Sequence, residues 1–192
     1  MSVLEKSTFA KMFEAAELCR QRALDVPMLV LIYTALDTLA WALYGNKVSK
    51  VSLRFILLCD EYVLPGTNIQ CTALELYSAR CSILHSLGWE SDLSKAGKAR
   101  SVFYSFGNDD PTLARAALEI TNPGEFVAVR ADELFAAAQK AVVALVALAP
   151  SDQKLAERLS VAAGKQYRSL ESNAGDEMFK AFIQKAQSSD CT

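Results

Sequence analysis

The chain has 192 residues, of which 52% are hydrophobic and 22% are charged, and its formal net charge at pH 7 is −2. This length favours one domain with its own core, and so small a net charge excludes an overall electrostatic pull onto nucleic acid or an anionic membrane, which leaves only local contacts with RNA. The five cysteines include no CxxC pair, and the single histidine with scattered carboxylates makes no zinc ligand set, so we expect reduced thiols, no metal and no cofactor.

The first two predicted helices differ in how their apolar residues are spread. Residues 2–24 repeat apolar side chains at steps of three and four, which predicts an amphipathic helix. Residues 26–44 are apolar nearly all round, which predicts a helix in the middle of the assembly or at an interface. Asp25 is its expected N-cap, Pro27 suits its first turn, and Gly45-Asn46 is its expected left-handed stop.

Two further helices complete the first ninety residues. Ser49 is the expected cap of a helix over residues 50–63, which the turn residues after it bring to an end. Thr67 or Asn68 then opens a fourth helix, which reaches Gly88. The sequence therefore predicts four consecutive helices at the start of the chain.

Two stretches are apolar enough to be mistaken for membrane spans, residues 26–44 and 131–149. The first carries Asp37 near its middle, and the second carries Asp132 and Glu133. Because charged side chains are costly inside a bilayer, buried helices of a soluble bundle explain both stretches better. The N-terminal residues are charged throughout and make no secretory signal. We therefore expect a cytoplasmic protein without membrane contact.

The second half of the chain mixes short strands with helices. Valine and aromatic residues predict strands near residues 101–107 and 125–130, which we expect to pair as a short β hairpin. Before a frayed tail, helices are predicted over residues 110–120, 131–149, 153–170 and 176–187.

These elements predict a single, mainly α domain over residues 1–192. A four-helix core of about residues 2–90 carries the further strands and helices of residues 91–187, which are expected to pack on it. The chain contains no internal repeat, low-complexity segment or clear linker that would divide it.

The fourth predicted helix carries Arg80 inside its apolar arc and His85 at the edge of that arc. Because they are five residues apart, their side chains point about 140° away from each other and are not expected to lie side by side on one straight helix. Arg80 needs an anion, since an unpaired buried charge is costly. Asp37, the sole acid of the apolar second helix, would satisfy both charges by forming an ion pair with Arg80.

The residues RCSILH, from Arg80 to His85, fit the pattern R-x4-6-H. Their position late in the fourth of four helices resembles the HEPN superfamily, whose members are helical bundles that commonly dimerise. The wider run YSARCSILHSLGWESDLSKAGKARSVFYSFG is similar to a group of small bacterial HEPN-like proteins. The likeness covers about residues 27–107.

The resemblance implies a metal-independent endoribonuclease, because in catalytic members the arginine and histidine of two protomers meet in a cleft at the dimer interface and cut RNA. These roles carry over to Arg80 and His85. An imidazole can take the proton of a 2′-hydroxyl or protonate the leaving 5′-oxygen, while a guanidinium holds the phosphate. Asp37, Cys81 and Ser82 are the expected supporting residues, although Cys81 stands where active members often have Asn, Asp or His.

Three basic residues follow the motif helix. Lys95, Lys98 and Arg100 are candidates for a basic rim that binds the phosphate backbone of RNA. The alternative is a solvated basic stretch beside acids such as Glu90 and Asp92.

Two functions stay open from the sequence. The first is a ribonuclease that acts as a homodimer on RNA, with Arg80 and His85 from both chains. The second is a non-catalytic HEPN-like bundle that binds a partner protein or a small ligand, with Arg80 paired to Asp37 for structural reasons. The second stays open because the thiol of Cys81 is a poor hydrogen-bonding substitute.

Overall fold

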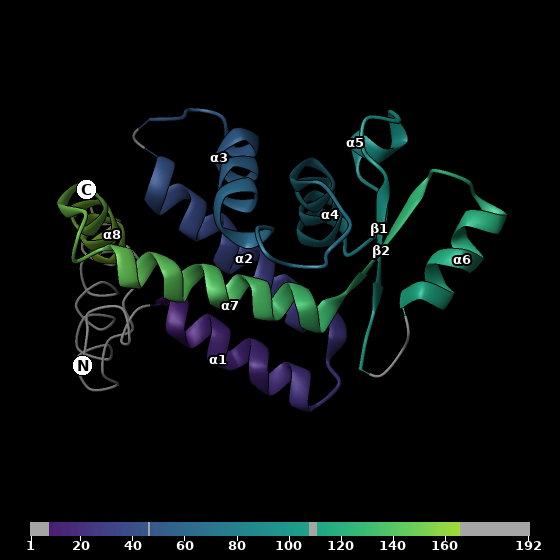
Figure 1. The fold of residues 1–192 in the computed structure, drawn as a ribbon, viewed down its shortest axis with the longest axis horizontal. Coiled ribbons are helices and arrows are strands. Elements are labelled where there is room, and N and C mark those ends of the chain that lie inside the picture. Colours follow the sequence, from purple (N-terminus) through teal and green to yellow (C-terminus); the bar gives the residue numbers. More distant parts are fainter. Residues whose placement is uncertain (1–7, 46, 108–110, 166–192) are drawn as a thin grey trace, which may run out of the picture.

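The computed structural model describes residues 8–45, 47–107 and 111–165. In chain order the elements are α1 (Thr8–Gln21), α2 (Asp25–Tyr44), α3 (Val51–Leu58), η1 (Cys59–Val63), α4 (Ala73–Ser86), α5 (Asp92–Lys95), β1 (Ser101–Ser105), α6 (Pro111–Thr121), β2 (Phe126–Arg130), α7 (Ala131–Leu148) and α8 (Gln153–Lys165). Helices surround α2, and the two strands lie toward one end of the molecule with α6 beyond them (Figure 1). The predicted mainly α fold is confirmed.

Helix α2 forms the centre of the core. Its residues Ile32, Tyr33 and Leu36 are fully buried, and α1, α3, α4 and α8 pack against it. By length and composition it is the one helix in the described part of the chain that could cross a membrane. Because 56% of its apolar window is buried within the fold, this hydrophobicity packs the core.

The two ends of α2 differ from the prediction. Leu24, and not Asp25, occupies the N-cap position, and it makes no side-chain capping bond. Asp25 instead lies in the first turn, where a carboxylate is stabilised by the positive end of the helix dipole. Gly45 keeps a right-handed backbone, with φ −54°, and its N–H donates to the carbonyl of Trp41, so Gly45 is not a left-handed stop. Asn46, the other residue expected there, lies outside the described residues.

The third helix ends in a wider turn. Helix α3 continues into η1, a π-helical turn after which the N–H of Leu64 donates to the carbonyl of Cys59 at 2.9 Å. Together α3 and η1 cover the predicted range of 50–63 except its first residue. Ser49 is not the cap, because Lys50 occupies that position without a side-chain hydrogen bond.

Helix α4 begins later than the predicted start at residues 67–68. The hydroxyl of Thr72 accepts a hydrogen bond from the N–H of Glu75 at 3.2 Å, and the carboxylate of Glu75 accepts one from the N–H of Thr72 at 2.7 Å. This reciprocal capping box determines where the helix starts. At the other end, Leu87 adopts a left-handed backbone with φ 51° and stops the helix just before Gly88.

The two predicted strands pair with each other in parallel. The register aligns Ser101 with Phe126 and Ser105 with Arg130. In the sequence, helix α6 lies between the two strands. It brings the chain back to the end of the sheet where β1 begins, so that β2 runs in the same direction (Figure 1). The expected β hairpin is therefore wrong: a hairpin is closed by a tight turn, whereas parallel strands need a crossover such as this helix.

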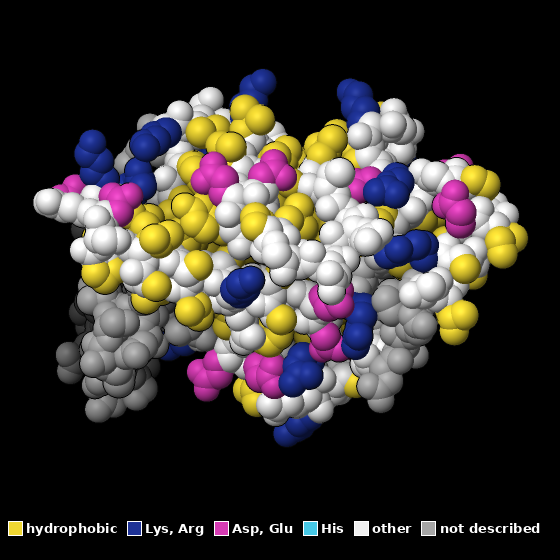
Figure 2. Space-filling model, in the orientation of Figure 1, with side chains coloured by type: hydrophobic (Ala, Val, Ile, Leu, Met, Phe, Trp, Pro, Cys, Tyr) yellow, Lys and Arg dark blue, Asp and Glu magenta, His cyan; other side chains and the backbone are white. Residues whose placement is uncertain are grey.

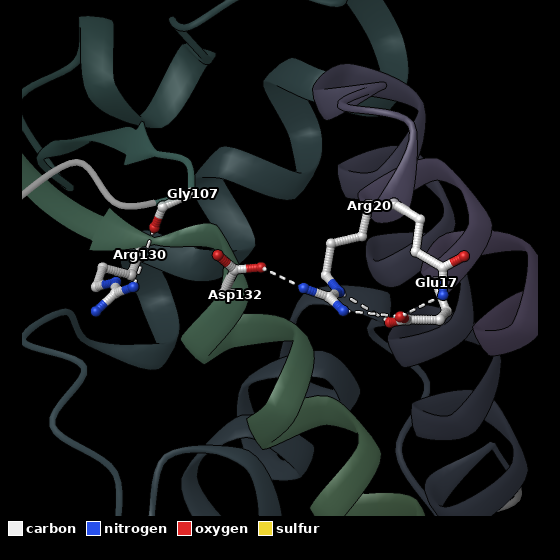
Figure 3. Close-up of polar contacts among 6 residues, drawn as sticks. Glu17, Arg20, Gly107, Arg130 and Asp132 are labelled. Carbon is white, nitrogen blue, oxygen red and sulfur yellow. Dashed lines mark hydrogen bonds and ion pairs between the residues drawn. The ribbon is translucent and has the colours of Figure 1, made fainter.

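Polar contacts connect α1 to the start of α7 (Figure 3). The guanidinium of Arg20 lies 2.8 Å from the carboxylate of Glu17 and 3.7 Å from that of Asp132. Nearby, Arg130 at the end of β2 donates to the carbonyl of Gly107 at 3.1 Å. Because exposed ion pairs contribute only about 0–1 kcal/mol each, these contacts mainly orient the elements.

Helix α6 leaves apolar residues on the surface. Leu113 and Ile120 are 73% and 81% exposed, and hydrophobic side chains lie along the outer edge of the molecule over α6 (Figure 2). Leu118 on the same helix lines an apolar hollow together with Val102 and Phe126 of the strands. One part of α6 thus covers the sheet and another stays in solvent.

Some predictions lie outside the described residues, namely residues 2–7 of the first helix, the predicted continuation of α8 to residue 170, the helix over 176–187 and the tail. The cysteines of the described part are free thiols, and they are Cys19, Cys59, Cys71 and Cys81.

Candidate functional site

Arg80 reaches from α4 toward α2 and pairs with Asp37. Its Nη2 donates to Oδ2 of Asp37 at 2.6 Å, and the two side chains are only 13% and 26% exposed. The ion pair expected from the sequence is therefore present. This ion pair joins α4 to α2. Without it, each helix would carry a partly buried charge with no partner, which would lower the stability of the fold.

The same guanidinium also contacts His85. Nη1 of Arg80 lies 3.3 Å from Nε2 of His85, whose imidazole is exposed in the last turn of α4. As a hydrogen bond this contact needs Nε2 as the acceptor, because an arginine side chain only donates hydrogen bonds. The prediction that the two side chains do not lie side by side is wrong, since the long arginine side chain spans the angle between their Cα–Cβ directions.

The environment keeps Arg80 charged. Burial by itself lowers the pKa of Arg80, but the hydrogen bond and the negative charge of Asp37 outweigh burial and raise the pKa above its ordinary value. The third nitrogen, Nε, is buried without a hydrogen-bond partner in the described part of the chain. The site thus holds a positive charge beside the imidazole of His85.

The two other expected supporting residues differ in position. Cys81 is partly exposed, and burial together with a hydrogen bond to this thiol raises the pKa of Tyr77 one turn earlier on α4. Ser82 is buried, and its hydroxyl donates to the carbonyl of Ala79 at 2.9 Å. Cys81 therefore lies beside Arg80, whereas Ser82 bonds to its own helix.

The candidate substrate-binding residues lie together, in a different place. Lys95, Lys98 and Arg100 line one hollow of about 540 Å³, which Arg80 and His85 do not line. The first turn of α4, the α5 region and the starts of both strands surround this hollow. The residues predicted as one site thus form two groups, which we call the Asp37–Arg80–His85 cluster and the basic hollow.

Within the basic hollow, Arg100 is held by Glu75. Nε and Nη2 of Arg100 lie 2.5 and 3.2 Å from the two carboxylate oxygens of Glu75, whose side chain is 8% exposed. Burial alone would raise the pKa of Glu75, but the hydrogen bonds from Arg100 and Thr72 lower it overall. Our sequence reasoning missed Glu75, although the T-x-x-E spacing of the capping box was visible at residues 72–75.

Trp89 is the second residue of the hollow that our sequence reasoning missed. Its indole stacks on the ring of Phe126, with centroids 5.5 Å apart and an angle of 29° between the planes. Trp89 is nevertheless 60% exposed. A tryptophan just after a helix stop carries no local signal that it will meet a strand far along the chain.

The described residues contain no group of three or more His, Cys, Asp or Glu side chains that could hold a metal ion. Comparison of the chain with protein-family models, with curated proteins and with solved structures found no match.

Proposed function

We propose that the chain is a HEPN-like, metal-independent endoribonuclease that acts as a homodimer in the cytoplasm. The observation that supports it is the 3.3 Å contact between Nη1 of Arg80 and Nε2 of the exposed His85. This contact places the guanidinium of Arg80, which can bind a phosphate, next to the imidazole of His85, which can transfer a proton. The two residues have the R-x4-H spacing.

The proposed reaction uses the 2′-hydroxyl of RNA as the nucleophile. Nε2 of His85 takes its proton, the 2′-oxygen attacks the adjacent phosphorus, and the bond from phosphorus to the 5′-oxygen breaks. An imidazolium protonates the leaving 5′-oxygen, which gives a 2′,3′-cyclic phosphate and a 5′-hydroxyl. Arg80, oriented by Asp37, turns Nη1 from the imidazole to a phosphate oxygen and stabilises the charge that develops there.

The proposed homodimer follows from the single histidine of the chain. A cleavage step that uses one imidazole as base and another as acid needs two chains. A twofold axis that brings the two copies of α4 together would place both imidazoles in one cleft. Lys95 and Lys98 are the proposed contacts to the RNA strand outside that cleft.

The test is cleavage of a labelled RNA by the purified full-length chain in EDTA. We expect His85→Ala to abolish cleavage with an unchanged circular dichroism spectrum. Ser86→Ala is the matched control, because it changes the next exposed residue, whose hydroxyl donates only to its own helix, to the carbonyl of Ser82 at 2.8 Å. A wild-type protein that leaves diverse RNAs intact, or a His85→Ala variant that cuts equally well, contradicts the proposal.

A second candidate is a non-catalytic HEPN-like bundle that binds a partner protein or a small ligand. It is favoured by the low exposure of Arg80, 13%, and by its ion pair with Asp37 of the same chain. On this proposal Arg80→Ala weakens the fold, and His85→Ala changes neither the fold nor any RNA. Cleavage that depends on His85 would exclude it.

A further inference from the structure

The basic hollow contains an exposed aromatic surface. Trp89 is 60% exposed, although the ring of Phe126 is stacked against its indole. The ring behind it limits the motion of the indole. Such supported aromatic rings are surfaces on which nucleic-acid bases stack, with little dependence on which base is present.

Two cations of the same hollow are available to an anion. Arg100 is already engaged by Glu75 through two contacts. Lys95 and Lys98 are exposed, and neither forms an ion pair with another residue of the described part. The hollow therefore has a stacking surface and two free ammonium groups within about 540 Å³, a volume ordinary for a small-ligand site.

The acids of the hollow limit the size of the anion. Glu90 and Glu125 also line it, so the hollow has two carboxylates as well as the two free lysines. A long polyanion would meet both signs of charge along this surface. A single nucleotide, alone or as one unit of a strand whose other phosphates lie outside the hollow, avoids this conflict because its base is uncharged and its phosphate can stay beside the lysines.

We propose that the basic hollow binds one nucleotide, with its base stacked on Trp89 and its phosphate beside Lys95 and Lys98. The nucleotide is either a free mononucleotide or one unit of an RNA strand, since both present the same chemistry. Only the second source rests on the proposed ribonuclease function.

The experiment uses Trp89 as its own reporter. The chain has two tryptophans, so Trp41→Phe leaves Trp89 as the only indole. AMP and a trimer of 2′-O-methyladenosine are titrated separately, and saturable quenching of Trp89 emission is expected. The trimer lacks a free 2′-hydroxyl and cannot be cut, so binding is measured independently of catalysis.

The variants separate stacking from charge. In anisotropy measurements with labelled ligand, Trp89→Ala should weaken binding by about 5- to 150-fold, and Trp89→Phe, which keeps a ring, should recover most of it. Lys95→Ala and Lys98→Ala should each weaken binding and its dependence on salt. Lys47→Ala, at an exposed lysine outside the hollow, is the matched control and should change neither.

The outcomes distinguish the two sources and the two proposals. Equal affinity for AMP and the trimer indicates a mononucleotide site, and much tighter binding of the trimer indicates a strand. Absence of saturable quenching by both ligands, or binding that Trp89→Ala leaves unchanged, overturns the proposal. A chain that cuts no RNA but binds AMP contradicts the ribonuclease alone.

Discussion

At the scale of single residues, the three nitrogens of Arg80 have three different surroundings. Nη2 is bonded to Asp37, Nη1 to His85, and Nε is buried without a partner in the described part. A purely structural arginine would be expected to have its buried donors satisfied. The bond from Nη1 to the exposed imidazole is the one that a phosphate oxygen can replace, because this partner is more exposed than Asp37.

The ion pair itself predicts a stability effect. Arg80→Ala leaves the partly buried Asp37 without its cation and should lower the free energy of unfolding by about 2–3 kcal/mol, less than fully buried pairs because Asp37 keeps some solvent contact. Chemical denaturation of Arg80→Ala, Asp37→Ala and the double variant measures the coupling free energy between the two side chains. Arg20→Ala, at an exposed pair, is the control and should cost less than about 1 kcal/mol. Additive single effects would contradict the pairing.

Glu75 predicts a dependence of stability on pH. Its folded pKa is lowered, so its contribution is fully present above the unfolded pKa of about 4.3 and is lost as the pH falls through the folded pKa. Glu75→Gln keeps a capping side chain but removes the charge that pairs with Arg100. The variant should be less stable than the wild type at pH 7, and the difference should shrink below about pH 4.3.

Denaturation at a series of pH values measures this difference. Glu90→Gln, which removes a carboxylate from the same hollow, is the control and should change stability little at pH 7. A wild-type advantage over Glu75→Gln that stays constant down to acid pH would contradict the assigned role of the ion pair.

At the scale of the elements, only one of three residues of a type that favours the N-cap position caps its helix. Asp25 and Ser49 were predicted to cap α2 and α3, and neither does. Thr72 caps α4 because Glu75 three residues later returns the hydrogen bond. A single favourable residue is thus weaker evidence for a helix start than the two-residue pattern.

The cap of α4 gives a prediction at this scale. Thr72→Ala removes the acceptor for the N–H of Glu75 and should lower the free energy of unfolding by about 1 kcal/mol. Ser49→Ala, at the wrongly predicted cap, should change it by less than about 0.5 kcal/mol. Equal effects of the two substitutions, measured by urea denaturation, would show that Thr72 does not act as a cap.

The strands illustrate what local pattern can and cannot predict. Their positions were predicted because β-branched and aromatic residues gather there, but their direction depends on what connects them. A helix had already been predicted over residues 110–120, between the strands. That helix was the available signal for a parallel pair, because antiparallel neighbours need only a short turn.

The candidate site was predictable only in part, for similar reasons. The Arg80–Asp37 pair followed from two isolated charges on apolar helices, which each needed a partner. The contact with His85 was missed because a helical projection gives the direction of a side chain and not its reach. Trp89 was missed because its partner Phe126 is brought to it by the tertiary fold.

At the scale of the whole molecule, the Asp37–Arg80–His85 cluster and the basic hollow both depend on α4. The helix carries Arg80 and His85 along its length, its first turn supplies Glu75 to the hollow, and Trp89 follows its end. Any displacement of α4 relative to the elements around it would therefore affect both groups. The Glu75–Arg100 and Arg80–Asp37 pairs connect α4 to its neighbours at its start and near its middle.

The parallel pairing of β1 and β2 also affects the order in which the chain can assemble. The first helices are joined by short connections and can find one another locally, which favours rapid association. The two strands meet only after the intervening polypeptide has closed a long loop, whose entropic cost precedes the first inter-strand hydrogen bond. The packing of α8 on α2 closes a longer loop still. We therefore expect the sheet, with the contact of Phe126 and Trp89, and the packing of α8 to form after the first helices associate.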